Sequence, residues 1–139
     1  MHPDRAAMIE TGRGEVSDDL CDRMGHFTTR YYTAAFDDAS YELVKSCGLI
    51  PDDETGFADL ELNMKFVAEI RAGEKYYIKS GFLKLGNSSF TALHQMYNAG
   101  TDSLVATTEE KAVVFDLKKR KSKPMPEEFR KLAEGFLVD

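Results

Sequence analysis

Residues 30–47 read RYYTAAFDDASYELVKSC and carry a clear helical pattern. Their apolar side chains recur at helical spacing, at Tyr32, Ala35, Phe36, Ala39, Leu43 and Cys47. Such spacing aligns them along one stripe of a helix, and Gly48 follows as a stop signal. The stretch therefore predicts one long amphipathic helix, whose apolar stripe must pack against another element.

The sequence after this helix changes to β-rich runs. Residues 51–55 (PDDET) predict an exposed loop. Four predicted strands follow, at residues 62–71, 75–86, 89–99 and 103–117. The links between them, AGE, GNS and GTD, are short and contain turn residues, so consecutive strands must be antiparallel.

Two short elements complete the predicted order. Glu15 and Val16 predict a short strand before the long helix, and residues 126–136 predict a terminal helix. The order is α+β, and a five-stranded antiparallel sheet that curls around one long helix satisfies it. Because the open edges of such a sheet need cover, we expect at least a homodimer, or a homotetramer.

Composition narrows the class of protein. A chain of 139 residues, 42% apolar and 30% charged, predicts one folded domain spanning residues 1–139. The net charge of -6 argues against nucleic-acid binding. The longest apolar runs fall far short of the roughly 20 residues that span a bilayer, and residues 1–12 lack the apolar centre of a secretory signal. We therefore expect a cytoplasmic protein with no membrane partner.

The two cysteines, Cys21 and Cys47, form neither a ligand spacing nor a framework of bridges, so we interpret them as reduced thiols without a role. No cluster of Cys, His and carboxylate residues has the spacing of metal ligands. The sequence predicts neither a metal nor another cofactor.

Two local patterns suggest chemistry. Residues 20–32 (LCDRMGHFTTRYY) bring an acid, a glycine and a histidine together just before the helix, which is typical of a helix cap or of an active site. Residues 116–126 (DLKKRKSKPMP) are strongly basic in an acidic chain. They are either a solvated loop or an anchor for an anionic ligand such as a phosphate-bearing molecule.

Three segments, in this order, carry a family resemblance: DRMGHFTTRYYTAAFDDASYELVKSCG, VAEIRAGEKYYIKSGFLKLGNSSFTALHQMY and LVATTEEKAVVFDLKKRKSKPMPEEFR. They begin with Asp-x-x-Gly-His and end with basic residues before Pro-x-Pro. From about Val16 to about Lys131 the chain resembles the hotdog-fold acyl-CoA thioesterases of the 4-hydroxybenzoyl-CoA thioesterase type. Within that group it looks most like the branch associated with carnitine breakdown, whose members are thought to act on betainyl-CoA.

The resemblance implies roles for the motif. Asp22 holds the place of the family's catalytic carboxylate, which attacks the thioester carbonyl or activates water. Gly25 lets the backbone approach the ligand or turn tightly. The backbone amide of Thr29, at the helix start, holds the thioester oxygen. Many relatives carry a histidine at that position, so no role is transferred to the Thr29 side chain. His26 either orients Asp22 or the substrate, or is a packed histidine.

The resemblance also implies binding residues. Tyr32 and Phe36 on the helix stripe are core residues by default, but in this fold some of that stripe lines the acyl pocket. The CoA phosphates would be met by the basic run, with Lys118, Lys119, Arg120, Lys121 and Lys123 as candidates.

Other interpretations remain open. Asp22 can be a solvated cap, and either Asp37 or Asp38 can be the catalytic acid, as in a different hotdog branch. His94 lies in an alternating strand, where a satisfied histidine is favoured over a ligand. A noncatalytic acyl-CoA-binding module keeps the same fold, and an enoyl-CoA hydratase is a less favoured alternative because the loop does not resemble the hydratase pattern.

Overall fold

The computed structural model describes residues 7–138. Its elements, in chain order, are β1 (Ile9–Glu15), the 3-10 helix η2 (Asp18–Leu20), α1 (Thr29–Ser46), β2 (Thr55–Phe66), β3 (Lys75–Leu85), β4 (Ser89–Asn98), β5 (Leu104–Asp116), β6 (Lys121–Ser122) and α2 (Glu127–Glu134). The long helix and the strands that follow it confirm the predicted α+β order.

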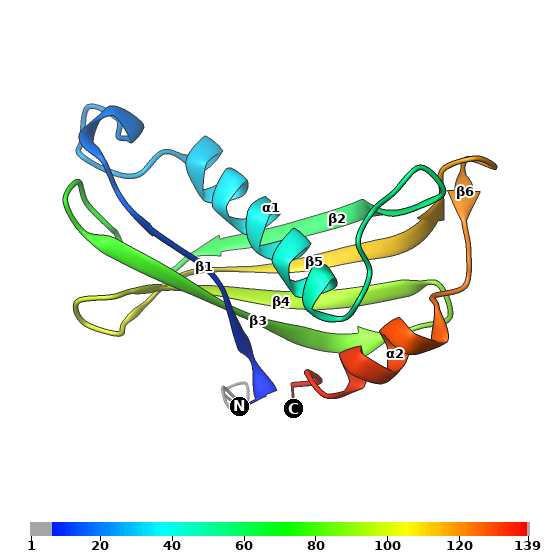
Figure 1. Ribbon diagram of the computed structural model, residues 1–139. Coiled ribbons are helices and arrows are strands. Elements are labelled where there is room, and N and C mark those ends of the chain that lie inside the picture. The colour runs from blue at the N-terminus through cyan, green and yellow to red at the C-terminus, as the bar shows by residue number, and fades with distance from the viewer. Residues whose placement is uncertain (1–6, 139) are drawn as a thin grey trace.

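The strands form one antiparallel sheet in the order β1-β3-β4-β5-β2, and the two-residue β6 adds to the end of β5. Figure 1 shows α1 lying along one face of this curved sheet, with α2 beside the end of β3. This is the hotdog fold, and it confirms the fold class that the sequence predicts. Strands β1 and β2 are the two edges of the sheet.

The apolar stripe of α1 explains why the helix lies against the sheet. Tyr32 and Phe36, in its first half, pack with Ile78 and Met96 from β3 and β4. The second half of α1 joins a cluster around Phe82, Phe90 and Phe129, which ties α2 to the sheet. Full burial of one such side chain contributes about 1.5–3 kcal/mol. Neither helix of the described chain is long and apolar enough to cross a membrane.

The edge strands differ from the sequence prediction. β2 begins at Thr55 and ends at Phe66, whereas the sequence predicted a strand over residues 62–71. β1 occupies Ile9–Glu15, far more than the predicted pair Glu15 and Val16. The reasons differ. β1 (IETGRGE) carries two glycines and no apolar alternation, so only its last residue was recognised. In β2, Leu60, Leu62, Met64 and Phe66 do alternate with polar residues, so the pattern was present and the prediction placed the strand too far toward its C-terminal end.

Candidate active site

The loop before α1 is held by the side chain of Asp22. Its Oδ1 accepts the backbone N–H groups of Met24, at 2.9 Å, and of His26, at 3.1 Å. The Asp22 N–H in turn donates to the His26 carbonyl oxygen at 3.0 Å. Within the described residues Oδ2 has no hydrogen-bond partner, and the side chain is exposed. One oxygen of the carboxylate thus fixes the loop, and the other remains available for chemistry.

Gly25 adopts the left-handed conformation, with φ at 79°. An added Cβ would meet no atom within 4 Å, so the glycine is required by the backbone conformation and not by a crowded neighbour. Of the two uses that the sequence left open for Gly25, the structure supports the tight turn.

The side chain of His26 pairs with an acid that the sequence did not single out. Its Nε2 lies 2.7 Å from Oε2 of Glu69, in the segment that follows β2. Both side chains are well exposed, at 40% and 58%. Glu69 belongs to no motif, and only the contact of its segment with the loop, through the bridge between His26 and Arg71, brings it here.

The first turn of α1 presents free donors. The carbonyl of Thr28, the N-cap residue, accepts the N–H groups of Tyr31 and Tyr32. The backbone N–H groups of Thr29 and Arg30 have no acceptor within residues 7–138. The Thr28 side chain makes no capping bond, and its buried hydroxyl has no partner in the part of the chain that the structure describes. Free amides at the positive end of a helix suit an oxygen that gains negative charge.

Two cavities lie along α1. The first, which we call the entrance cavity, has a volume of about 380 Å³ and includes His26, Thr29, Tyr32, Phe66 and Glu69 in its lining. Asp22 lies on the loop next to His26 but outside this lining.

The second, the helix–sheet cavity, has a volume of about 290 Å³ and lies further along the helix. It is lined by α1 and the sheet, and Phe36 is part of it. Tyr32 and Phe36 thus both line a cavity while remaining buried. The role of Tyr32 and Phe36 in the packed core is confirmed, and their role in binding the acyl group stays a prediction.

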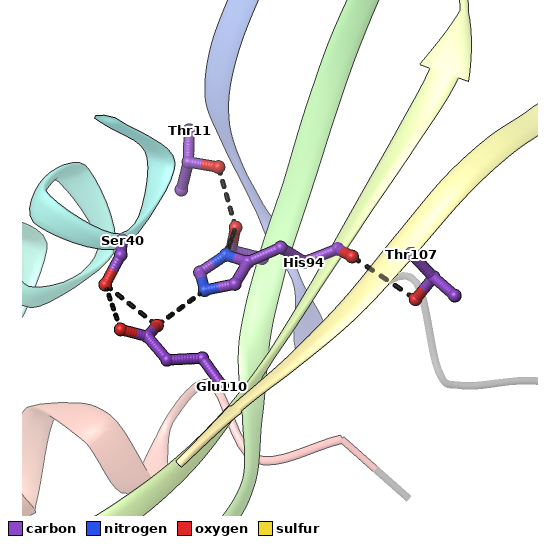
Figure 2. A network of polar contacts seen from close by, with 6 residues as sticks. Thr11, Ser40, His94, Thr107 and Glu110 are labelled. Atoms are coloured by element: carbon purple, nitrogen blue, oxygen red, sulfur yellow. Dashed lines mark hydrogen bonds and ion pairs between the residues drawn. The ribbon is translucent and has the colours of Figure 1, made fainter. Parts of the chain in front are cut away.

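A chain of buried polar contacts forms one wall of the helix–sheet cavity (Figure 2). His94 Nε2 lies 2.8 Å from Oε1 of Glu110, and the Ser40 hydroxyl donates to both Glu110 oxygens at 2.7 and 2.8 Å. On the other side of the ring, His94 Nδ1 lies 2.6 Å from Ser80 Oγ, which contacts Thr11 Oγ1 at 2.7 Å. Both ring nitrogens are partnered, which confirms the interpretation of His94 as a satisfied sheet histidine.

Burial controls the protonation of this wall. It lowers the pKa of His94 to about 4, so the ring is neutral at pH 7. Partial desolvation raises the pKa of Asp59, an exposed residue on β2, to about 7, with hydrogen bonding to Glu110 and the charge of Glu110 adding to the effect. No group of three or more His, Cys, Asp or Glu side chains in the described chain is arranged to hold a metal ion.

The two acids in the middle of α1 diverge, as adjacent helix residues must. Asp37 lines the helix–sheet cavity, and its pKa is raised by desolvation and then by the charges of Asp59 and Asp38. Asp38 is not part of that lining, and its charge adds to the burial that raises the pKa of Tyr76. Of these two alternative acids, only Asp37 faces a cavity.

The basic run lies at the opposite end of the sheet from Asp22. The Thr55 end of β2 pairs with Asp116, whereas its Phe66 end lines the entrance cavity. These ends are separated by a strand of 12 residues, about 36 Å at 3.3 Å per residue. Within one chain, Lys118, Lys119, Arg120 and Lys121 therefore do not join the residues of the loop.

Contacts within the run order its backbone more than its side chains. Oδ1 of Asp116 accepts the backbone N–H groups of Lys118 and Lys119, and Arg120 adopts a φ of 58°. The Lys118 ammonium lies 3.1 Å from Glu54, and the Arg120 guanidinium lies over the ring of Phe115.

The fold and this loop define a class of protein with an acid on the loop that leads into a helix N-terminus and with cavities along the helix. Residues 16–132 match the family model described as the thioesterase-like superfamily, and the chain belongs to that family. A search of curated proteins found no match to the chain.

Solved structures share the fold. The hypothetical protein SAV2348 from Staphylococcus aureus, solved in complex with CoA, is 16% identical, with 93% of this chain and 84% of that one covered and a TM-score of 0.83. Slr0204, a 1,4-dihydroxy-2-naphthoyl-CoA thioesterase from Synechocystis, is 15% identical, with 87% of this chain and 92% of that one covered and a TM-score of 0.75. BH1999, a gentisyl-coenzyme A thioesterase, is 21% identical, with 86% of this chain and 96% of that one covered and a TM-score of 0.76.

Proposed function

We propose that this protein hydrolyses an acyl-CoA thioester to the free acid and CoA, with Asp22 as the catalytic carboxylate. One observation carries the proposal: Asp22 is anchored on the loop that leads directly to the unpaired N–H groups of Thr29 and Arg30. A carboxylate beside preorganised donors is the arrangement that acyl transfer requires. Membership of the thioesterase-like superfamily supports the same reaction.

The reaction needs two functions from these groups. The Thr29 N–H stabilises the thioester oxygen as a tetrahedral intermediate forms. Asp22 Oδ2 either takes a proton from the attacking water or attacks the carbonyl carbon itself, in which case water then hydrolyses the mixed anhydride. In both routes the C–S bond breaks and CoA leaves as the thiol. His26, paired with Glu69 at the lining of the entrance cavity, orients the substrate.

We further propose that the protein acts as a homodimer, paired through β2. This edge strand of 12 residues exposes Leu60, Leu62 and Phe66 at 61%, 49% and 54%. A long, apolar and exposed edge strand is a template for pairing with another chain. Light scattering on the purified protein should give at least twice the mass of one chain, and Leu60→Lys should shift the protein toward monomer.

Such a dimer would also give the basic run a role. Two β2 strands that pair about a two-fold axis run antiparallel, so the Thr55 end of one lies beside the Phe66 end of the other. The basic run of one subunit then approaches the entrance cavity of its partner, about 36 Å from its own. On this proposal the cations at positions 118 to 121 bind the CoA phosphates across the interface.

The identity of the acyl group can be determined with a panel of acyl-CoA substrates. Two of the similar structures are named for aromatic CoA thioesters, whereas the resemblance of the sequence pointed to betainyl-CoA. None of the structures named above supports the betainyl branch. The panel should therefore contain short, long, aromatic and betainyl thioesters, with thiol release as the readout.

The decisive variant is Asp22→Asn, because an asparagine Oδ1 can still accept the two loop amides. We expect this variant to fold normally and to lose at least roughly 10²-fold in kcat, the low end for general acid–base catalysis. Melting temperature is the control for folding. Wild-type protein that binds acyl-CoA but releases no thiol would leave the noncatalytic module as the function.

A further inference from the structure

The helix–sheet cavity carries an unusual charge for a site that receives an acyl chain. Three carboxyl groups line it, from Asp37 on α1, Asp59 on β2 and Glu110 on β5. Arg30, near its outer end, is the one Lys or Arg in the lining, and it is exposed. Half of the remaining lining residues are apolar, including Phe36 and Met64.

Glu110 is the most buried of these acids, with 2% of its surface exposed. It is held by the Ser40 hydroxyl, by His94 and by a hydrogen bond with Asp59, and none of these supplies a positive charge, because burial keeps His94 neutral. A buried carboxylate is normally paired with a cation, since desolvation of an isolated charge is costly. Within the described residues no Lys or Arg side chain pairs with the Glu110 carboxyl group.

Thr108 provides a second, independent sign of a missing partner. Its side chain is 99% buried, at 1% exposure, and its Oγ1 has no hydrogen-bond partner within the described residues. Thr108 lies on the same face of β5 as Glu110, directly opposite His94, and lines the cavity. Buried hydroxyl groups are normally satisfied, so an orphaned one in a cavity wall indicates that a ligand group completes it.

The position of the helix–sheet cavity along α1 sets how far an acyl chain must extend from Thr29 to enter it. Thr29, whose amide would hold the thioester oxygen, precedes Thr33 by four residues and Asp37 by eight, or about 6 and 12 Å at 1.5 Å per residue. A thioester carbonyl at Thr29 would therefore direct its acyl chain past Phe36 toward Thr108 and Glu110.

We propose that the helix–sheet cavity recognises an acyl group with an ammonium at its far end. The ammonium pairs with the carboxyl groups of Glu110 and Asp59 and donates a hydrogen bond to the Thr108 hydroxyl. The proposal rests on the thioesterase function, because it assigns the far end of that substrate. The apolar part of the lining holds the methylene chain, and the carboxyl groups hold the cation. The ammonium lies several bonds beyond the carbonyl. The acyl group of betainyl-CoA is too short for this separation.

The test uses three thioesters matched in length: 6-aminohexanoyl-CoA, heptanoyl-CoA and adipoyl-CoA, with positive, neutral and negative ends. We expect wild-type kcat/KM to favour the ammonium over the methyl end by roughly 10-fold or more, the range of a hydrogen bond to a charged group. The carboxylate end should be the poorest. Dissociation constants measured with Asp22→Asn provide the same comparison without turnover.

Three variants test whether the preference for the ammonium end arises in the helix–sheet cavity. Thr108→Val is nearly isosteric and should lower the ammonium preference several-fold without loss of folding, since it removes an unpartnered hydroxyl. Asp59→Asn should lower it further. Thr107→Val is the matched control, because that hydroxyl bonds to the His94 carbonyl oxygen outside the cavity. A structural role for Thr108 would change the melting temperature alone and leave the preference intact.

The outcomes separate this inference from the proposed function. Turnover of all three thioesters with equal kcat/KM would overturn the inference and leave the thioesterase standing. Absence of turnover, with ammonium-selective binding that Thr108→Val weakens, would support the inference and remove the hydrolase. An ammonium preference that survives both Thr108→Val and Asp59→Asn would overturn the assignment to this cavity.

Discussion

The loop before α1 and the polar wall of the helix–sheet cavity are both built around a carboxylate, but in opposite ways. Asp22 is exposed and is held by amides two and four residues away. Glu110 is buried and is held by side chains 16 and 70 residues away. A local, exposed acid can exchange protons and meet substrate, whereas a buried acid with distant partners fixes charge and shape. On the two proposals made above, chemistry and substrate recognition lie at different points along α1.

The largest expected effect comes from Asp22→Ala, compared with Asp22→Asn. Both remove the carboxylate, so both should lose at least roughly 10²-fold in kcat. Only alanine also removes the acceptor of the two loop amides, so only alanine should lower the melting temperature. If asparagine retained wild-type kcat while alanine did not, Asp22 would serve the turn alone. Thiol release and thermal denaturation on both variants decide this.

At the other carboxylate the effect should fall on stability. Glu110→Ala leaves the buried His94 N–H and the Ser40 hydroxyl without their acceptor, and each orphaned group costs about 1–3 kcal/mol. We expect the melting temperature to fall by roughly 10 °C. Glu109→Ala is the matched control, because Glu109 is the adjacent, exposed residue on the other face of β5. Equal melting temperatures for the two variants would contradict the structural role of Glu110.

The features that could be predicted from the sequence are the local ones, and those formed by residues distant in the sequence could not be predicted. The helix was predicted within one residue at each end, because an apolar stripe is a local pattern. The loop at Asp22, Gly25 and His26 was found for the same reason. The wall formed by Ser40, His94 and Glu110 was not predicted, because strand register and the placement of α1 bring its members together. Glu69 was missed because it approaches His26 only through a tertiary bridge.

The pH dependence of stability should reveal Asp59. Its pKa is raised from 3.8 in a model compound to about 7 by burial, hydrogen bonding to Glu110 and the Glu110 charge, with His94 opposing the shift. Asp37 and Arg30 also line this cavity. A raised carboxyl pKa means that the folded state binds more protons, so stability falls as pH rises from about 4 to about 7. Asp59→Asn should remove this contribution to the pH dependence.

We expect the melting temperature of Asp59→Asn to exceed that of wild type at pH 8, and the difference to shrink as pH falls toward 4. Asparagine also supplies a permanent donor to Glu110. A difference that is constant with pH would show that Asp59 does not titrate in this range.

The smallest effect should come from the exposed pair of His26 and Glu69. Exposed side-chain pairs of this kind contribute at most about 0.2–1 kcal/mol, so His26→Gln, Glu69→Gln and the double variant should melt within a few degrees of wild type. Since we propose that His26 orients the substrate, thiol release should fall, but by less than at Asp22. A loss as large as that of Asp22→Asn would move His26 into the chemical step.

The central claim is that Asp22 performs chemistry at the start of α1. The most direct measurement is thiol release from the best acyl-CoA of the panel by wild type and by Asp22→Asn, with their melting temperatures matched. The account predicts a loss of at least roughly 10²-fold in kcat at unchanged stability. Equal turnover by the two proteins would contradict it, and the catalytic carboxylate would then have to be sought at Asp37, which faces the helix–sheet cavity.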